Sequence, residues 1–156
     1  MHPVASAAYR LALALWVGGM SVFTFVVTPV IFRTQTRDVA GKIVGALFPV
    51  YFRFCLVLAA VALVARAAAG EAVSGARQMV GTALIVFCLG IVSYHTYGLA
   101  PRMAEVRETI VSPETAPEEA PARREFSRLH GLSMTLNLVV IASGVVLILW
   151  YETFRG

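Results

Sequence analysis

The side chains with the most chemical potential in this sequence lie inside long apolar runs. Arg53 is the only formal charge between residues 43 and 65, and His95, His130 and Asn137 lie in two later runs. An arginine near the centre of a bilayer costs at least about 2.5–3.5 kcal/mol, so it normally faces other helices and has a partner. Since a guanidinium can hold an anionic group and an imidazole a metal ion, we expect these four residues to bind a small ligand.

The two histidines allow two interpretations. His95 and His130 are expected at similar depth on neighbouring helices, where neutral imidazoles could be the axial ligands of a b-type haem. Each could instead hydrogen-bond a neighbour at the level of the lipid headgroups, which is the simpler role for a pair without a motif spacing. Thr24, Asn137 and Arg53 are expected at a second level about two turns deeper, and whether their helix faces meet depends on helix rotation.

A second group of side chains carries sulfur. Together with the histidines, thiols and thioethers would suit Cu(I) or a similar soft metal ion. Cysteine and methionine are also ordinary fillers of apolar cores, so core packing is the competing interpretation. The residues concerned are Met20, Cys55, Cys88 and Met134.

Motifs for hydrolysis and nucleotide binding are missing from the sequence. Acidic residues such as Asp38 and Glu71 fall between the apolar runs, and no carboxylate pair lies within one. HExxH, Walker A and dinucleotide fingerprints are absent. We therefore predict no catalytic residue, although a redox reaction on a bound cofactor would leave little trace in a sequence. No internal repeat stands out.

The composition identifies the elements that must position these residues. Of the 156 residues 58% are hydrophobic and 14% charged, whereas a soluble domain carries roughly 25% charged residues. Each of four apolar runs is long enough for a helix across a hydrocarbon core of about 30 Å, and backbone groups in lipid must be paired within their own segment. We predict an all-α, integral membrane four-helix bundle, one domain over residues 1–156, with helices at 11–32, 43–65, 78–99 and 129–151.

The basic residues indicate how the chain is oriented. The net charge of +4 comes from cations at the edges of apolar runs and not from a polar face, which argues against a nucleic-acid partner. Cytoplasmic loops carry the excess of lysine and arginine. We therefore expect an inner-membrane protein with both termini on the periplasmic side. The predicted cytoplasmic cations are Arg33, Arg37, Lys42, Arg102, Arg107, Arg123, Arg124 and Arg128, and the outer ones are Arg10, Arg66, Arg77 and Arg155.

The long loop from residue 100 to 127 suggests an alternative function. Prolines at 113, 117 and 121 prevent a continuous helix there, and Met103, Val106 and Ile110 have the spacing of a short interfacial helix. Such a loop could dock a partner, which would make the protein a structural or accessory subunit of a larger respiratory or photosynthetic membrane complex, or a homo-oligomer.

Small residues and one amide could also serve packing alone. Glycine lets helix backbones approach closely in a membrane, and asparagine hydrogen-bonds across helices. The residues with this simpler interpretation are Gly18, Gly19, Gly81, Gly144 and Asn137.

Two segments resemble the signatures of the transmembrane protein 205-like family. They are ALFPVYFRF at 46–54 and FSRLHGLSMTLNL at 126–138, supported by WVGG from Trp16 and by Pro101-Arg102. The resemblance implies a four-helix membrane domain of largely unknown activity, with members linked to resistance to cisplatin, a soft-metal drug. It implies family positions at Pro49, Tyr51, Phe52, His130, Gly131 and Asn137, with Arg53 where a histidine can stand.

The WVGG segment also resembles copper-resistance D type proteins and haem-dependent protoporphyrinogen oxidases. Those proteins tend to place a histidine about two turns before the tryptophan, where this chain has Tyr9. A haem would then depend on His95 and His130, or on His2. Binding of a soft metal ion or small ligand therefore stands as the main prediction, with the accessory subunit and haem b as alternatives.

Overall fold

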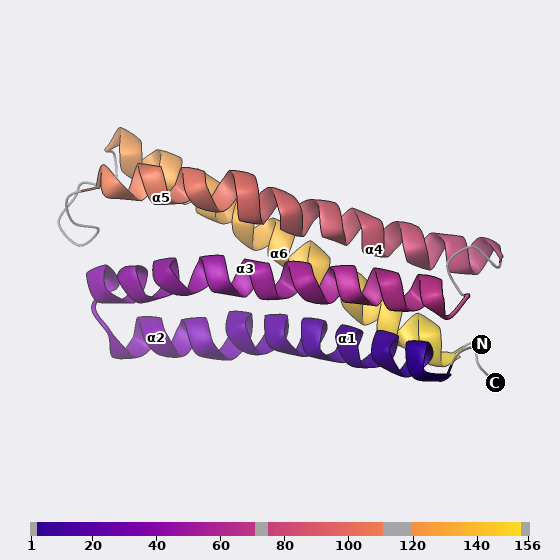
Figure 1. Ribbon diagram of the computed structural model, residues 1–156. Coiled ribbons are helices and arrows are strands. Elements are labelled where there is room, and N and C mark those ends of the chain that lie inside the picture. Colours follow the sequence, from indigo (N-terminus) through magenta and orange to yellow (C-terminus); the bar gives the residue numbers. More distant parts are fainter. Residues whose placement is uncertain (1–2, 71–74, 111–119, 154–156) are drawn as a thin grey trace.

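The structure is a computed structural model that describes residues 3–70, 75–110 and 120–153. The described residues form four long helical rods that run antiparallel in sequence order (Figure 1). The rods comprise, in order, α1 (Pro3–Val22), the π-helical segment η1 (Phe23–Val27) and α2 (Thr28–Thr34); α3 (Arg37–Ala68); α4 (Ala76–Tyr94), the π-helical segment η2 (His95–Leu99) and α5 (Ala100–Glu108); and α6 (Pro121–Thr153).

All four rods are long and apolar enough to span a membrane. This confirms the predicted all-α class and the predicted four helices that are long and apolar enough to span a membrane. At 1.5 Å per residue, α3 with its 32 residues is about 48 Å long, which exceeds a hydrocarbon core of about 30 Å. The helices continue past the predicted apolar runs because their charged flanks remain helical outside the hydrocarbon. Large exposed side chains on the rods are mostly Val, Leu and Phe, as expected for a surface in contact with lipid.

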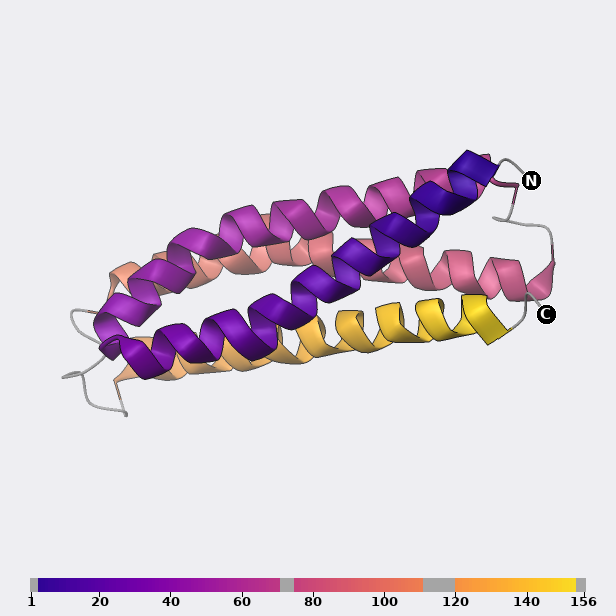
Figure 2. The same ribbon diagram turned by 90° about the horizontal axis from the view of Figure 1, so that it is seen from below.

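The four rods pack around one core. The first rod packs most extensively on α3 and also crosses α6, as Figure 2 shows from below. The largest fully buried side chains in this core include Tyr9, Trp16 and Met20 from α1, Cys55 from α3, and Ile85 and Cys88 from α4. The N- and C-terminal ends of the described chain lie at one end of the bundle, opposite the α2–α3 connection (Figure 1).

A π-helical segment interrupts both the first and the third rod just before a proline. Pro29 and Pro101 each lack an N–H group and would collide with the carbonyl four residues earlier. The preceding residues absorb this disturbance, because the Thr28 N–H bonds to the Phe23 carbonyl and the Ala100 N–H to the His95 carbonyl. Single-turn π-helical segments within α-helices are frequent at functional sites.

The two interrupted rods share a short sequence pattern around their π-helical segments, with a threonine and a proline at matching positions. FTFVVTP at 23–29 aligns with HTYGLAP at 95–101 without a gap. The same alignment pairs buried positions of the two rods: Tyr9 with Gly81, Leu13 with Ile85, Trp16 with Cys88, and Met20 with Val92. The rods therefore bury equivalent faces.

Three of the four predicted packing glycines lie at close contacts. A side chain at Gly144 would collide with Val17, so α1 and α6 touch at that point. Gly19 faces the Phe54 ring, and Gly81 faces the guanidinium of Arg66. Gly18 is the exception, because a Cβ there would meet nothing within 4 Å.

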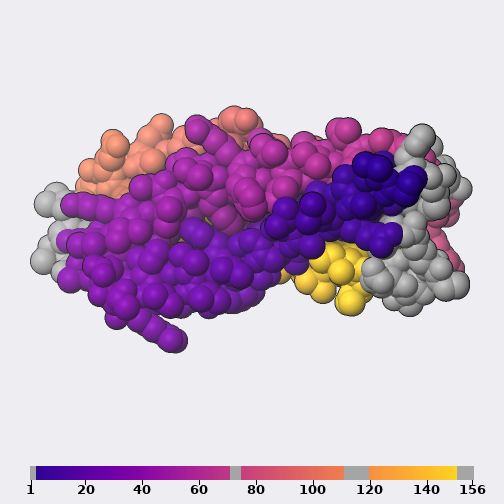
Figure 3. Space-filling view, turned by 60° about the horizontal axis from the view of Figure 1, so that its bottom comes forward, coloured from indigo at the N-terminus to yellow at the C-terminus, as the bar shows by residue number. Residues whose placement is uncertain are grey.

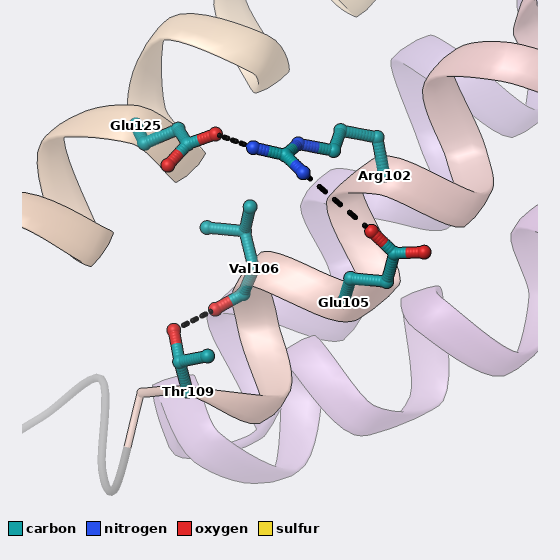
Figure 4. A network of polar contacts seen from close by, with 5 residues as sticks. All are labelled: Arg102, Glu105, Val106, Thr109 and Glu125. Atoms are coloured by element: carbon teal, nitrogen blue, oxygen red, sulfur yellow. Dashed lines mark hydrogen bonds and ion pairs between the residues drawn. The ribbon is translucent and has the colours of Figure 1, made fainter.

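An ion pair attaches α5 to α6. Arg102 of α5 pairs with Glu125 of α6 at 2.7 Å and with Glu105 at 3.7 Å, and Thr109 donates to the Val106 carbonyl at 2.6 Å (Figure 4). Exposed ion pairs of this kind are worth at most about 1 kcal/mol. Met103 and Val106 are buried under them, as expected for a short amphipathic helix.

A second arginine joins α5 to α3. The Arg107 guanidinium donates to the Gly41 carbonyl and covers Gly45 one turn later. A larger residue at either glycine would displace it. The end of the predicted loop is helical, because α6 already begins at Pro121, and residues 111–119 with Pro113 and Pro117 lie outside the described residues.

Candidate functional site

A buried polar network joins three rods near the centre of the bundle. The Tyr51 hydroxyl of α3 donates to Asn137 Oδ1 of α6 at 2.7 Å. Asn137 Nδ2 then donates to Thr24 Oγ1 of η1 at 2.8 Å. Hydrogen bonds of this type hold transmembrane helices together. Thr24 and Asn137, which were expected only to share a depth, are thus in direct contact.

Four aromatic rings continue from this network across α3. Phe23 stacks on Tyr51 with 4.3 Å between centroids, and Tyr51 meets Phe52 edge to face at 5.0 Å. The His95 ring of η2 lies 4.6 Å from Phe52. We call Phe23, Thr24, Tyr51, Phe52, His95 and Asn137 together the aromatic–polar centre.

His95 has the most informative environment in the aromatic–polar centre. Its side chain is only 1% exposed, and its Nε2 atom has no hydrogen-bond partner in the described part of the chain. Leaving a buried polar group unpaired costs about 1–3 kcal/mol. The site can therefore gain a hydrogen bond if a ligand reaches this nitrogen.

Both π-helical segments contribute to the aromatic–polar centre. Phe23 and Thr24 are the first residues of η1, and His95 is the first residue of η2, where it aligns with Phe23. Phe23 and His95 each place their ring against an aromatic residue of α3. Pro29 and Pro101, which follow η1 and η2, thus fix the local helix geometry where the first and third rods meet α3.

The predicted four-residue cluster does not form. His95 and Asn137 belong to the aromatic–polar centre, but Arg53 is exposed on the outer surface of α3. The expectation that Arg53 faces the other helices is wrong, because α3 is rotated so that Tyr51, Phe52 and Cys55 face inward. His130 is half-buried, and its ring stacks on Phe126 of its own helix at 6.1 Å.

The sulfur-bearing residues do not gather at one place either. Met20, Cys55 and Cys88 are buried in the core, whereas Met134 is 38% exposed. The Cys55 thiol contacts the Tyr51 hydroxyl, and the Cys88 thiol contacts Ser143. Among residues 3–70, 75–110 and 120–153, no group of three or more His, Cys, Asp and Glu side chains is placed to hold a metal ion.

Arg66 is a buried cation that the sequence analysis treated only as an orientation signal. It is 6% exposed and bonds through Nε to Thr82 Oγ1 at 3.0 Å and through Nη2 to the Gln78 carbonyl at 3.1 Å. Nη1 donates to the Tyr9 hydroxyl at 3.4 Å, and the guanidinium carbon lies 5.4 Å from the Tyr9 ring centre. Arg66 therefore links α3 to α1 and α4.

An apolar groove on the bundle surface borders the aromatic–polar centre at Phe23 and Tyr51. It lies between the first rod and α3, the face shown in Figure 3, and has a volume of about 360 Å³. Gly19, Phe23, Tyr51 and Phe54 are among its lining residues. The groove opens on a surface that contacts lipid.

Comparison with known proteins places the chain in a family. A family profile described as "Domain of unknown function (DUF4149)" matches residues 11–112. An uncharacterized protein of Aquifex aeolicus (strain VF5) is 30% identical over 148 residues, covering 92% of this chain and 97% of the relative. No solved structure matches the chain significantly. This multi-pass membrane protein belongs to the DUF4149 family, whose function is unknown.

Proposed function

We propose that this protein binds a small, uncharged, hydrogen-bonding ligand inside the membrane at the aromatic–polar centre. The observation that carries the proposal is the buried His95 side chain with its unpaired Nε2. Ionisable residues inside a membrane protein generally mark functional sites. The nearby Tyr51–Asn137–Thr24 network supplies further polar groups at the same site.

An uncharged ligand suits this site better than the soft metal ion or haem suggested by the sequence. His95 lies beside the apolar ring of Phe52, while the second histidine, His130, stacks elsewhere on Phe126. Within residues 3–70, 75–110 and 120–153 this site has one imidazole and no cluster of further metal ligands, which favours a hydrogen bond over coordination. The resemblance to the transmembrane protein 205-like family supports this proposal in one respect only. Members of that family are linked to resistance to a small soft-metal compound.

The ligand would enter from the bilayer. The groove that Phe23 and Tyr51 line is apolar and open toward lipid, so it would admit a lipid-soluble molecule. Ligand sites in proteins are generally concave, mostly apolar and provided with a few polar groups. The groove and the aromatic–polar centre together have this character.

Replacing His95 by phenylalanine tests the proposal. The variant keeps a ring against Phe52 but removes the hydrogen-bonding nitrogen. Native mass spectrometry of the protein released gently from its membranes should show a small-molecule adduct, reduced about tenfold in His95→Phe because one buried hydrogen bond is worth about 1–1.5 kcal/mol. The matched variant His130→Phe should keep the adduct.

Three results would count against this assignment. The adduct could be missing from the wild-type protein, persist in His95→Phe, or disappear equally in His130→Phe. A silver ion bound one to one and lost in His95→Phe would assign the site to a soft metal instead. A Soret band that sharpens on dithionite reduction would assign it to haem b.

We also propose that the protein lies in the inner membrane with both termini on the periplasmic side. The bundle end at the α2–α3 connection carries Arg33, Arg37 and Lys42, and α5 and α6 extend this basic end with Arg102 and Arg124. At the opposite end Arg66 is buried in the bundle. The bias toward one end therefore follows the positive-inside rule.

Reporter fusions check this orientation. A reporter enzyme that is active only outside the cytoplasm should be active when fused after residue 156, and a fluorescent protein that folds only in the cytoplasm should stay dark there. Fusions placed between α2 and α3 should give the opposite pattern. Fluorescence from the C-terminal fusion would reverse the orientation.

A further inference from the structure

Arg53 lies on the face of α3 that points away from the bundle. Its neighbours on this face, Val50 and Val57, are 65% and 59% exposed. Ala46 one turn further along is exposed as well. Arg53 is itself exposed and makes no hydrogen bond or ion pair with any residue in the described ranges.

The same residue lies deep in the membrane. It is near the centre of the 32-residue α3, and at 1.5 Å per residue it is more than about 20 Å from either helix end. Its chain neighbour Phe52 contacts His95, and Phe54 contacts Gly19 in the middle of the first rod. Arg53 is therefore close to the middle of a hydrocarbon core of about 30 Å.

A guanidinium in that position needs acceptors that lipid tails do not provide. It has five N–H donors and no acceptor, and it stays protonated. Polar groups in the hydrocarbon region are satisfied by protein or by a water-filled cavity. The exposed face around Arg53 thus lacks a partner that carries a negative charge at this depth.

We propose that this face of α3 docks a transmembrane helix of another membrane protein, one that carries an aspartate or glutamate at the depth of Arg53. A carboxylate can accept two parallel hydrogen bonds from one guanidinium, which makes the pair strong and specific. The small side chain of Ala46, two turns from Arg53 on this face, lets a second helix approach closely.

A second copy of this chain does not provide the required charge. The sequence has 9 acidic residues, and none lies between residues 39 and 70, 72 and 104, or 126 and 151. Symmetric docking of two copies through this face would bring one Arg53 toward the other. Charge complementarity therefore selects a different protein as the partner.

Synthetic transmembrane helices test the docking surface directly. The purified protein is reconstituted in phosphatidylcholine vesicles with labelled leucine–alanine helices that carry one central glutamate, glutamine or leucine, and association is measured by energy transfer. We expect the glutamate helix to bind at least tenfold more tightly than the leucine helix. Arg53→Leu should abolish this preference, and Arg53→Lys should weaken but retain it because an ammonium is a single point charge.

A matched variant on the same helix tests whether the preference for glutamate depends on Arg53 itself or on the positive charge of the protein in general. Lys42→Leu removes an exposed cation near the end of α3 and should leave the preference for glutamate unchanged. Circular dichroism and thermal unfolding of Arg53→Leu should match the wild-type protein, because its side chain is exposed and makes no hydrogen bond or ion pair within the described ranges.

Two outcomes would overturn the proposal. One is a glutamate helix that binds no better than the leucine helix, or equally well to Arg53→Leu. The other is an Arg53-dependent enrichment of phosphatidylglycerol around the protein in mixed vesicles without any preference for the glutamate helix. That second result would show that the guanidinium reaches lipid phosphates instead of a protein carboxylate.

Discussion

Replacing Arg66 by alanine is expected to lower the free energy of unfolding by about 2–4 kcal/mol, the largest effect of any single substitution considered for this bundle. The change removes hydrogen bonds to Thr82, Gln78 and Tyr9 and leaves a cavity between three rods. Reversible unfolding in mixed detergent micelles measures the loss.

Three matched variants identify the cause of that loss. Arg66→Lys should recover only part of the stability, because one ammonium cannot reproduce the geometry of the guanidinium. Gly81→Ala should also destabilise, since its Cβ would lie 2.9 Å from Arg66 Nη2. Arg124→Ala, at an exposed position of α6, should change stability by less than about 0.5 kcal/mol. A loss at Arg66 no greater than at Arg124 would contradict the assignment.

Replacing Asn137 by leucine should be the next most damaging change, at about 1–3 kcal/mol. The substitution breaks both hydrogen bonds of the buried network and leaves the Tyr51 hydroxyl without its acceptor. Interhelical hydrogen bonds in membranes are worth about 0.6–2 kcal/mol each. The same unfolding assay measures the change.

A double-mutant cycle with Tyr51→Phe isolates the hydrogen bond between the two side chains. Tyr51→Phe should cost about 1 kcal/mol in the wild-type protein and almost nothing in Asn137→Leu, which gives a coupling energy of about 1 kcal/mol. Thr135→Val is the control, because Thr135 is exposed and bonds only its own helix at Gly131. Strict additivity of the two changes would show that the bond does not stabilise the bundle.

The number and approximate place of the helices could be predicted because length and hydropathy alone determine them in a membrane. Depth could be predicted in part, since Thr24 and Asn137 do meet. The rotation of each helix about its axis could not be predicted. This rotation determines that Arg66 is buried and Arg53 is exposed. A signal for it exists along α3, where small residues at helical spacing mark the packed face. That series is Cys55, Ala59 and Ala62, and Arg66 follows on the same face, while Arg53 falls among valines on the opposite face.

The aromatic–polar centre was predicted only in part for a related reason. His95 was chosen because a histidine in an apolar run is unusual, but nothing in the spacing showed that His130 would stack on Phe126 instead of joining it. The similarity of FTFVVTP and HTYGLAP could not be recognised from the sequence because few identical residues align. It is recognised from the π-helical hydrogen bonds that precede the two prolines.

The central claim is that His95 Nε2 is kept buried and unpaired so that a ligand can use it. The most direct measurement is the free energy of unfolding of ligand-free His95→Phe in lipid nanodiscs, compared with wild type and with His130→Phe. Removing an unpaired polar atom while keeping the ring should leave stability equal or raise it by about 1 kcal/mol. A loss greater than about 1 kcal/mol would show that the imidazole is bonded within the fold and unavailable to a ligand.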